Sequence, residues 1–171
     1  MHKDEYERLA PYIKIENNLA ENNPSEYVKK ENELRNFSYS SIDINTADTA
    51  AFISLPGIGS KLAARIINFR GKLGGFYSIN QVGETYGVPD STFQKIKQYL
   101  KLETTSVKKI NINTVTVDEL KSHPYIKYTI ANPVIAYRNE HGLFAKVEDI
   151  KKVMAVTDEI YNKIAPYITT Q

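Results

Sequence analysis

Cysteine is absent from the 171 residues of the chain, which excludes disulfides, zinc fingers and iron–sulfur clusters. No apolar run approaches the roughly 18 residues that a membrane-spanning helix needs. The first ten residues, MHKDEYERLA, are mostly charged or polar and do not have the pattern of a signal peptide. The formal net charge is only +2, which is too small by itself to indicate a nucleic-acid partner.

The composition that remains is that of a folded protein, with 42% hydrophobic and 11% aromatic residues. The charge is spread unevenly along the chain. Residues 1–40 carry 6 Lys/Arg against 8 Asp/Glu, residues 41–102 carry 7 against 4, and residues 103–171 carry 9 against 8. The excess of positive charge therefore lies in the middle third of the chain.

An internal repeat organises the sequence, which matches itself without a gap when residue 44 is placed on residue 112. Ile44-Asn45-Thr46 recurs as Ile112-Asn113-Thr114, and Phe69-Arg70 recurs as Tyr137-Arg138. A match at a fixed period indicates a duplicated structural unit. We therefore expect two copies of one fold, a first domain over residues 41–103 and a second over residues 110–171.

The end of the repeat has its own pattern, which reads FQKIKQYL at 93–100 and YNKIAPYI at 161–168. A similar segment, YERLAPYIKI, occupies residues 6–15. We interpret residues 1–15 as the terminal helix of a truncated repeat; the alternative is an unrelated helix with a chance similarity. Residues 16–40 are polar, contain Asn-Asn-Pro, and predict a linker that is partly helical.

Local signals within each repeat predict helices. Thr116-x-x-Glu119 and Ser78-x-x-Gln81 have the spacing of capping boxes. Gly71 stands where a helix would end in a left-handed turn. The segments between helix breakers are short, and helices below about 12 residues must pack on one another to be stable. The expected fold class is all-α, with four or five short packed helices per repeat and no substantial sheet.

The stretch SLPGIGSKLAARIINFR, residues 54–70, places flexible residues at the start of a helix. Pro56 ends the preceding helix, and Gly57 and Gly59 can take positive φ at little cost. Ile58 between them is expected to turn inward as an apolar plug. The backbone N–H groups of residues 57–61 would then be free at a helix N-terminus, which is a natural site for an anion.

Basic side chains follow this turn closely enough to reach the same anion. The candidate phosphate-binding residues are Gly57, Ile58, Gly59, Ser60, Lys61, Arg65, Arg70 and Lys72. A tight helix connector without any ligand is the alternative interpretation.

These residues resemble a known family. The pattern L-P-G-I-G-x-x-x-A at 55–63 resembles the helix-hairpin-helix motif of non-sequence-specific DNA-binding proteins. The longer frame INTADTAAFISLPGIGSKLAARIINFR, followed by Gly-Gly-Phe, is similar to the competence protein ComEA family. The resemblance implies tandem helix-hairpin-helix repeats with two motifs each, double-stranded DNA as partner, a role in DNA uptake, and a bacterial envelope or periplasmic location.

The other three hairpin positions depart from the two-glycine pattern. Tyr86–Asp90 has one glycine and an acidic residue, and the second repeat has none in His123–Lys127 or Met154–Asp158. Pro133 also disfavours regular helix in the second repeat. We therefore expect weak, non-specific DNA binding through the first repeat only, with the second repeat degenerate.

The same hairpin also resembles that of helix-hairpin-helix DNA glycosylases, in which a lysine at the place of Lys61 attacks the sugar. Such enzymes need an aspartate further along the chain, at the place where this sequence has Ile79. We therefore expect no enzymatic activity, no cofactor, no metal and no small-molecule substrate. The competing function is an architectural or protein-interaction scaffold, with partners or self-association through the N-terminal segment.

Overall fold

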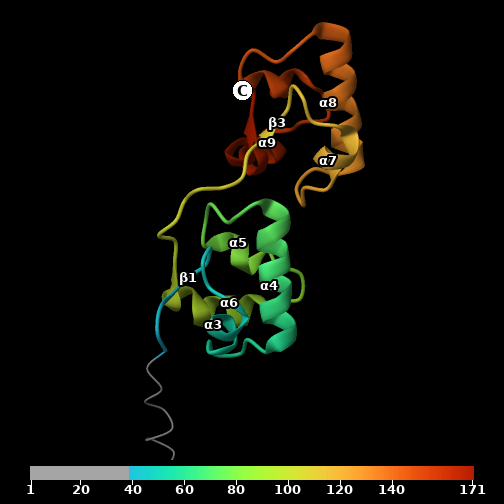
Figure 1. Ribbon diagram of the computed structural model, residues 1–171. Helices are drawn as coiled ribbons and strands as arrows, with labels where there is room; N and C mark the ends of the chain where they lie inside the picture. The colour runs from blue at the N-terminus through green and yellow to red at the C-terminus, as the bar shows by residue number, and fades with distance from the viewer. Residues whose placement is uncertain (1–38) are drawn as a thin grey trace, which may run out of the picture. The chain divides into compact units, whose positions relative to one another are not determined.

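The computed structural model describes residues 39–171 (Figure 1). The proposed terminal helix of a truncated repeat and nearly all of the proposed linker lie outside the described residues. No helix in the described part of the chain is long and apolar enough to cross a membrane.

The first repeat begins and ends with short strands that pair with each other. β1 (Ile42–Asp43) runs parallel to β2 (Leu100–Lys101), with Ile42 opposite Leu100. Between them lie α3 (Thr49–Ile53), α4 (Ser60–Leu73), α5 (Asn80–Gly83), α6 (Asp90–Ile96) and the 3-10 helix η2 (Lys97–Tyr99), shown in Figure 1. The pairing of the strands closes the repeat on itself.

The second repeat has the same order of elements. They are β3 (Ile110–Asn111), α7 (Val117–Lys121), α8 (Tyr128–His141), the 3-10 helix η3 (Val147–Lys152), α9 (Asp158–Ile164), the 3-10 helix η4 (Ala165–Tyr167) and β4 (Ile168–Thr169). Apart from α5 and η3, each element begins and ends at the positions that the sequence repeat matches to its counterpart. β3 and β4 also pair in parallel. The all-helical fold class is confirmed, because two-residue strand pairs are the whole sheet content of the described residues.

Two helix boundaries differ from the sequence expectations. Gly71 lies inside α4, which continues to Leu73, and Gly74 is the residue that takes the left-handed turn, with φ +83°. α8 contains Pro133 and still continues to His141. Buried side chains on both sides of the proline, Ile130 and Val134, hold this helix against the core and offset the lost hydrogen bond.

The two capping boxes also differ from each other. At the start of α7, Thr116 Oγ1 accepts the Glu119 N–H and Glu119 Oε2 accepts the Thr116 N–H, so this box is complete. Near α5 only half a box forms, because Gln81 Oε1 accepts the Ser78 N–H while Ser78 Oγ accepts from Asn80. Gln81 is instead buried, and its side-chain amide bonds to two tyrosine hydroxyls of the second repeat.

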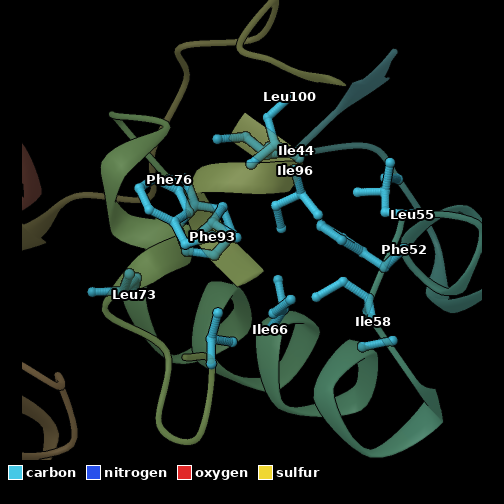
Figure 2. Packing of buried hydrophobic residues seen from close by; sticks show 14 of the residues in the cluster. Ile44, Phe52, Leu55, Ile58, Ile66, Leu73, Phe76, Phe93, Ile96 and Leu100 are labelled. Carbon is cyan, nitrogen blue, oxygen red and sulfur yellow. The ribbon is translucent and has the colours of Figure 1, made fainter. Parts of the chain in front are cut away.

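The core of the first repeat gathers apolar side chains from helices and loops along its whole length. In Figure 2, Ile44, Phe52, Ile66, Phe76 and Ile96 point toward a common centre, and all five are fully buried. Burial of an apolar side chain of this size contributes about 1.5–3 kcal/mol. Short helices that are unstable alone are held in place by this shared core.

Polar side chains fix the loops of both repeats in the same way. The Asn45 side chain donates to the Phe76 carbonyl and accepts the Phe76 N–H, both at 2.8 Å. The Arg70 guanidinium donates to the carbonyls of Ile44 and Ala47 at 3.0 and 2.7 Å. Asn113 and Arg138 make the equivalent bonds in the second repeat. The repeated asparagine and arginine therefore hold the fold.

Tyrosine side chains of the second repeat join the two repeats. The Gln81 side-chain amide donates to the hydroxyls of Tyr125 and Tyr167, at 2.9 and 2.8 Å. The Tyr125 hydroxyl donates to a Glu84 carboxylate oxygen at 2.7 Å, and that of Tyr167 donates to the Gly75 carbonyl at 2.9 Å. Burial raises the pKa of Tyr167 to about 12 and raises that of Tyr125 further, so both hydroxyls remain donors.

His123 lies in the same junction and should make the stability of the fold depend on pH. The side chain is 2% exposed, and burial lowers its pKa to about 4. The unfolded chain takes up a proton near pH 6.5 that the folded chain does not take up until about pH 4. The free energy of unfolding should therefore not be reduced by His123 above about pH 6.5, and it should fall by about 2–3 kcal/mol as the pH drops to 4.

The control is His123→Leu, which installs the residue type of the matching position, Leu55. Urea unfolding at pH 7 and pH 4 should show a smaller loss for this variant than for the unaltered chain, because carboxylates shared by both titrate equally. Identical losses in the two proteins would mean that His123 contributes nothing to the pH dependence.

Candidate nucleic-acid interface

The first hairpin connects α3 to α4. Ser54 follows α3 and Gly59 directly precedes α4, as the sequence predicts. Ile58 is 4% exposed, so it is the expected apolar plug. Its N–H group is not free, however, because it donates to the Leu55 carbonyl at 3.2 Å and closes the turn. Ile58 therefore shapes the site without offering an amide to a ligand.

The two glycines of this hairpin have different reasons to be there. Gly57 has φ +81°, and a Cβ on it would lie 3.3 Å from Thr92 Cγ2. Gly59 has φ −90°, a conformation open to any residue, and no atom lies within 4 Å of a Cβ built on it. The expectation of positive φ therefore holds for Gly57 and is wrong for Gly59. What Gly59 contributes is open space above the start of α4.

Backbone N–H groups without a partner lie at the start of α4, next to that open space. The Ala63 N–H is the first in α4 to bond within the helix, to the Gly59 carbonyl at 3.0 Å. The N–H groups of Ser60, Lys61 and Leu62 come before it, and no side chain caps the helix at Gly59. In the described part of the chain, these donors and the partial positive charge of a 14-residue helix are available to an anion.

The candidate basic residues divide into two groups. Lys61, Arg65 and Lys72 are exposed and, at steps of four and seven positions, lie on one face of α4, which contains no acidic residue. Arg70 is half-buried, and its guanidinium donates hydrogen bonds to two backbone carbonyls. Lys61 and Arg65 therefore lie near the hairpin, and Lys72 lies at the far end of the helix. Arg70 instead holds the loop at Ile44 and Ala47 in place.

A second hairpin, Tyr86–Pro89 between α5 and α6, lies beside the first. A Cβ on Gly57 would approach Thr92 of α6, and one on Gly87, whose φ is +86°, would meet Arg65 of α4. The Arg65 guanidinium carbon also lies 5.1 Å from the centroid of the Tyr86 ring. Each hairpin thus contacts the helix that follows the other hairpin.

This second hairpin was not among the candidate residues predicted from the sequence. The available signal was Gly87-Val88, which resembles Gly57-Ile58 and likewise stands just before a helix. Val88 is buried like Ile58, and its N–H closes the same turn by donating to Thr85 at 3.1 Å. Tyr86 between them is 83% exposed. Pro89 and Asp90 begin α6 with a missing N–H and a negative charge, so this hairpin offers an anion less than the first.

The hairpins of the second repeat turn without any left-handed residue. Tyr125 occupies the place of Gly57, and its hydroxyl bonds to Gln81 and Glu84 of the first repeat. Lys127 occupies the place of Gly59. Thr157 caps α9 by accepting the Ile160 N–H at 3.3 Å. The two glycine positions of the first hairpin thus carry side chains here, and α8 begins at Lys127 without a side-chain cap.

Ion pairs between lysines and carboxylates also distinguish the two repeats. In the second repeat four lysines each lie within 4 Å of a carboxylate; the pairs are Lys121–Asp118, Lys151–Asp158, Lys152–Asp149 and Lys163–Glu159. Among the described residues of the first repeat, no lysine or arginine has such a partner. Positive charge is therefore free to meet an external anion mainly in the first repeat.

Comparison with known proteins agrees with this architecture. A family model described as a helix-hairpin-helix motif matches residues 38–101 and again residues 105–169. ComE operon protein 1 of Bacillus subtilis (strain 168) is 39% identical over 62 residues, covering 36% of this chain and 30% of that protein.

Longer matches at lower identity come from vertebrates. The "Endonuclease/exonuclease/phosphatase family domain-containing protein 1" of Danio rerio is 27% identical over 141 residues, covering 72% of this chain and 26% of that protein. Its Homo sapiens counterpart is 22% identical over 152 residues, covering 72% and 27%. The chain spans only about a quarter to a third of the length of these relatives. No solved structure matches the chain.

Two matches of the motif, each covering one repeat, coincide with the duplicated fold and its hairpins. The similarity to ComE operon protein 1 specifies the kind of helix-hairpin-helix protein. The chain belongs to the helix-hairpin-helix family of DNA-binding motifs, as a ComEA-like member with two tandem copies.

Proposed function

We propose that this chain binds double-stranded DNA without sequence specificity, through the backbone of the first hairpin. The observation that carries the proposal is the open, uncapped start of α4 at Gly59, with Lys61 and Arg65 exposed on the same helix. Two phosphate oxygens could accept from the N–H groups of residues 60–62 while the cations neutralise their charge. Such contacts position a protein on DNA without reading bases, which is why the binding would be non-specific.

The second repeat supports the fold in this proposal and does not use its own hairpins. Tyr125 and Lys127 stand where the first hairpin is open, and most of the nearby lysines are already paired. We further propose that the chain acts in DNA uptake, on the strength of its similarity to ComE operon protein 1.

We also propose that the chain itself is not an enzyme. The vertebrate relatives carry "endonuclease/exonuclease/phosphatase" in their names, and the chain matches about a quarter of their length. Ile79, which stands where a glycosylase would need an aspartate after Lys61, packs against the core of the first repeat.

Titration with random-sequence duplex DNA at several salt concentrations tests the proposal. Two to four neutralised phosphates would give a slope of log K against log salt of about −2 to −4. The expected Kd is about 10⁻⁴ to 10⁻⁶ M at physiological salt. Lys61→Ala should weaken binding to all sequences equally and flatten the slope by about one.

Lys127→Ala is the matched control, since Lys127 is exposed at the same hairpin of the second repeat, and it should change little. If the unaltered chain fails to bind duplex DNA even at low salt, the scaffold function takes the place of DNA binding.

A further inference from the structure

A groove of about 640 Å³ lies where the C-terminal end of α4 meets the segment that leads into the second repeat. Three lysines line it: Lys72 from α4 and Lys108 and Lys109 from the connecting segment. The lining also includes the polar side chains of Asn111 and Thr114. This groove is separate from both hairpins of the first repeat.

The electrostatic balance of the groove favours an anion. Glu119 is the carboxylate in its lining, and one of its oxygens already accepts the N–H and the hydroxyl of Thr116, at 3.0 and 2.8 Å. Those hydrogen bonds lower the pKa of Glu119, so it stays charged within its capping box. None of the three lysines forms an ion pair with a carboxylate in the described residues, which leaves a local excess of two positive charges.

The connecting segment is held against the end of α4. The Lys108 N–H donates to the Gly74 carbonyl at 2.8 Å. A Cβ on Gly74 would lie 2.9 Å from the Lys108 Cβ, so the two backbones approach as closely as glycine allows. Tyr167 and Gln81 bind the two repeats to each other through their side chains. The lysines therefore start from a fixed backbone, which reduces the entropy lost when they meet a ligand.

The groove continues the basic face of α4. Lys72 follows Lys61 by eleven positions on the same face, a distance of about 16 Å along the helix axis. Arg65 lies between them. A phosphate chain that begins at the first hairpin could follow this face to Lys108 and Lys109. The repeated phosphates of nucleic acid match such a row of cations better than a single small anion does.

We propose that this groove is a second phosphate-binding site, which holds the backbone of the same DNA duplex beyond the hairpin. The inference rests on the proposed function and extends it, because the second repeat then contributes a wall of the groove although its own hairpins lack glycine. With about two phosphates engaged here and about two at the hairpin, the salt slope of the unaltered chain should lie near the steep end of the expected range, about −4.

The test compares two triple variants that lose the same charge. Lys72→Gln/Lys108→Gln/Lys109→Gln should flatten the salt slope by about two and weaken binding at least about tenfold at low salt. Lys146→Gln/Lys151→Gln/Lys152→Gln, which removes lysines from another part of the second repeat, should change the slope by less than about half a unit. Thermal unfolding of both variants verifies that the fold is kept.

The outcomes separate this inference from the proposed function. If the unaltered chain binds DNA and the two triple variants bind with equal slopes, the groove is not a phosphate site although the hairpin proposal stands. If the unaltered chain does not bind at all, both proposals are overturned.

Discussion

Gly59→Asp should remove most DNA binding and leave the fold at least as stable as before. The backbone of Gly59 is extended and a side chain there meets no atom, so aspartate fits without strain. Its carboxylate would cap α4 and interact favourably with the helix dipole, which is worth about 0.3–1 kcal/mol. The same carboxylate would occupy the N–H groups of Lys61 or Leu62 and repel phosphate. Losing one charged hydrogen bond of about 1.5–3 kcal/mol lowers affinity about tenfold or more.

Fluorescence anisotropy with a labelled duplex measures the affinity, and thermal unfolding measures the stability. Thr157→Asp, which adds the same charge at the cap of α9, is the control and should change affinity less than about threefold. Gly57 is the wrong position for this test, because a side chain at φ +81° costs about 1–2 kcal/mol of folding free energy by itself. Unchanged DNA binding by the Gly59→Asp variant would refute the role of the α4 amides.

Tyr167→Ala should cause the largest loss of stability of any substitution considered, about 3–5 kcal/mol. The side chain is 0% exposed and packs with the core of the first repeat, although it belongs to the second. Its ring also lies 4.8 Å from that of His123, centroid to centroid. Removing it opens a cavity and leaves the buried amide of Gln81 with one partner fewer. We expect urea unfolding at an earlier midpoint and in two steps, because the repeats lose their main connection.

Tyr167→Phe separates the two contributions to that loss. The ring stays buried, while the hydrogen bonds to Gln81 and Gly75 disappear, so the expected loss is about 1–3 kcal/mol. A Tyr167→Ala variant that remains within about 1 kcal/mol of the unaltered chain would show that the two repeats fold independently.

Much of the fold could be predicted because its cause is local and duplicated. The gapless sequence repeat preserved the apolar positions, and the helices of the two repeats recur in the same frame. Ile58 between two glycines predicted a buried plug, and Thr116 with Glu119 predicted a capped helix. Boundaries were harder to predict, since a left-handed residue is needed at Gly74 and not at Gly71, and only the loop that packs there decides between them.

The site was predicted less completely because distant parts of the chain decide what its residues do. Arg70 lies between Arg65 and Lys72 in the sequence, yet its guanidinium donates to the carbonyls of Ile44 and Ala47. In the sequence, Tyr125 stands where the first repeat has Gly57, so it is interpreted only as the loss of a glycine. The tertiary structure shows that its hydroxyl bonds to Gln81 and Glu84. Spacing along a helix could group Lys61 with Arg65 and Lys72, but it could not bring Lys108 to the end of that helix.

An amide NMR titration of the whole chain with random-sequence duplex DNA at low salt tests most directly whether the first hairpin binds DNA. Each hairpin has backbone amides that report separately, so one experiment compares all of them in one molecule. We predict that chemical-shift changes concentrate at Gly57 and residues 59–62, with smaller ones at Tyr86 and Gly87 and little change at residues 125–129 and 154–158. Equal shifts at the hairpins of the second repeat, or no shifts at residues 59–62 when DNA is bound, would contradict it.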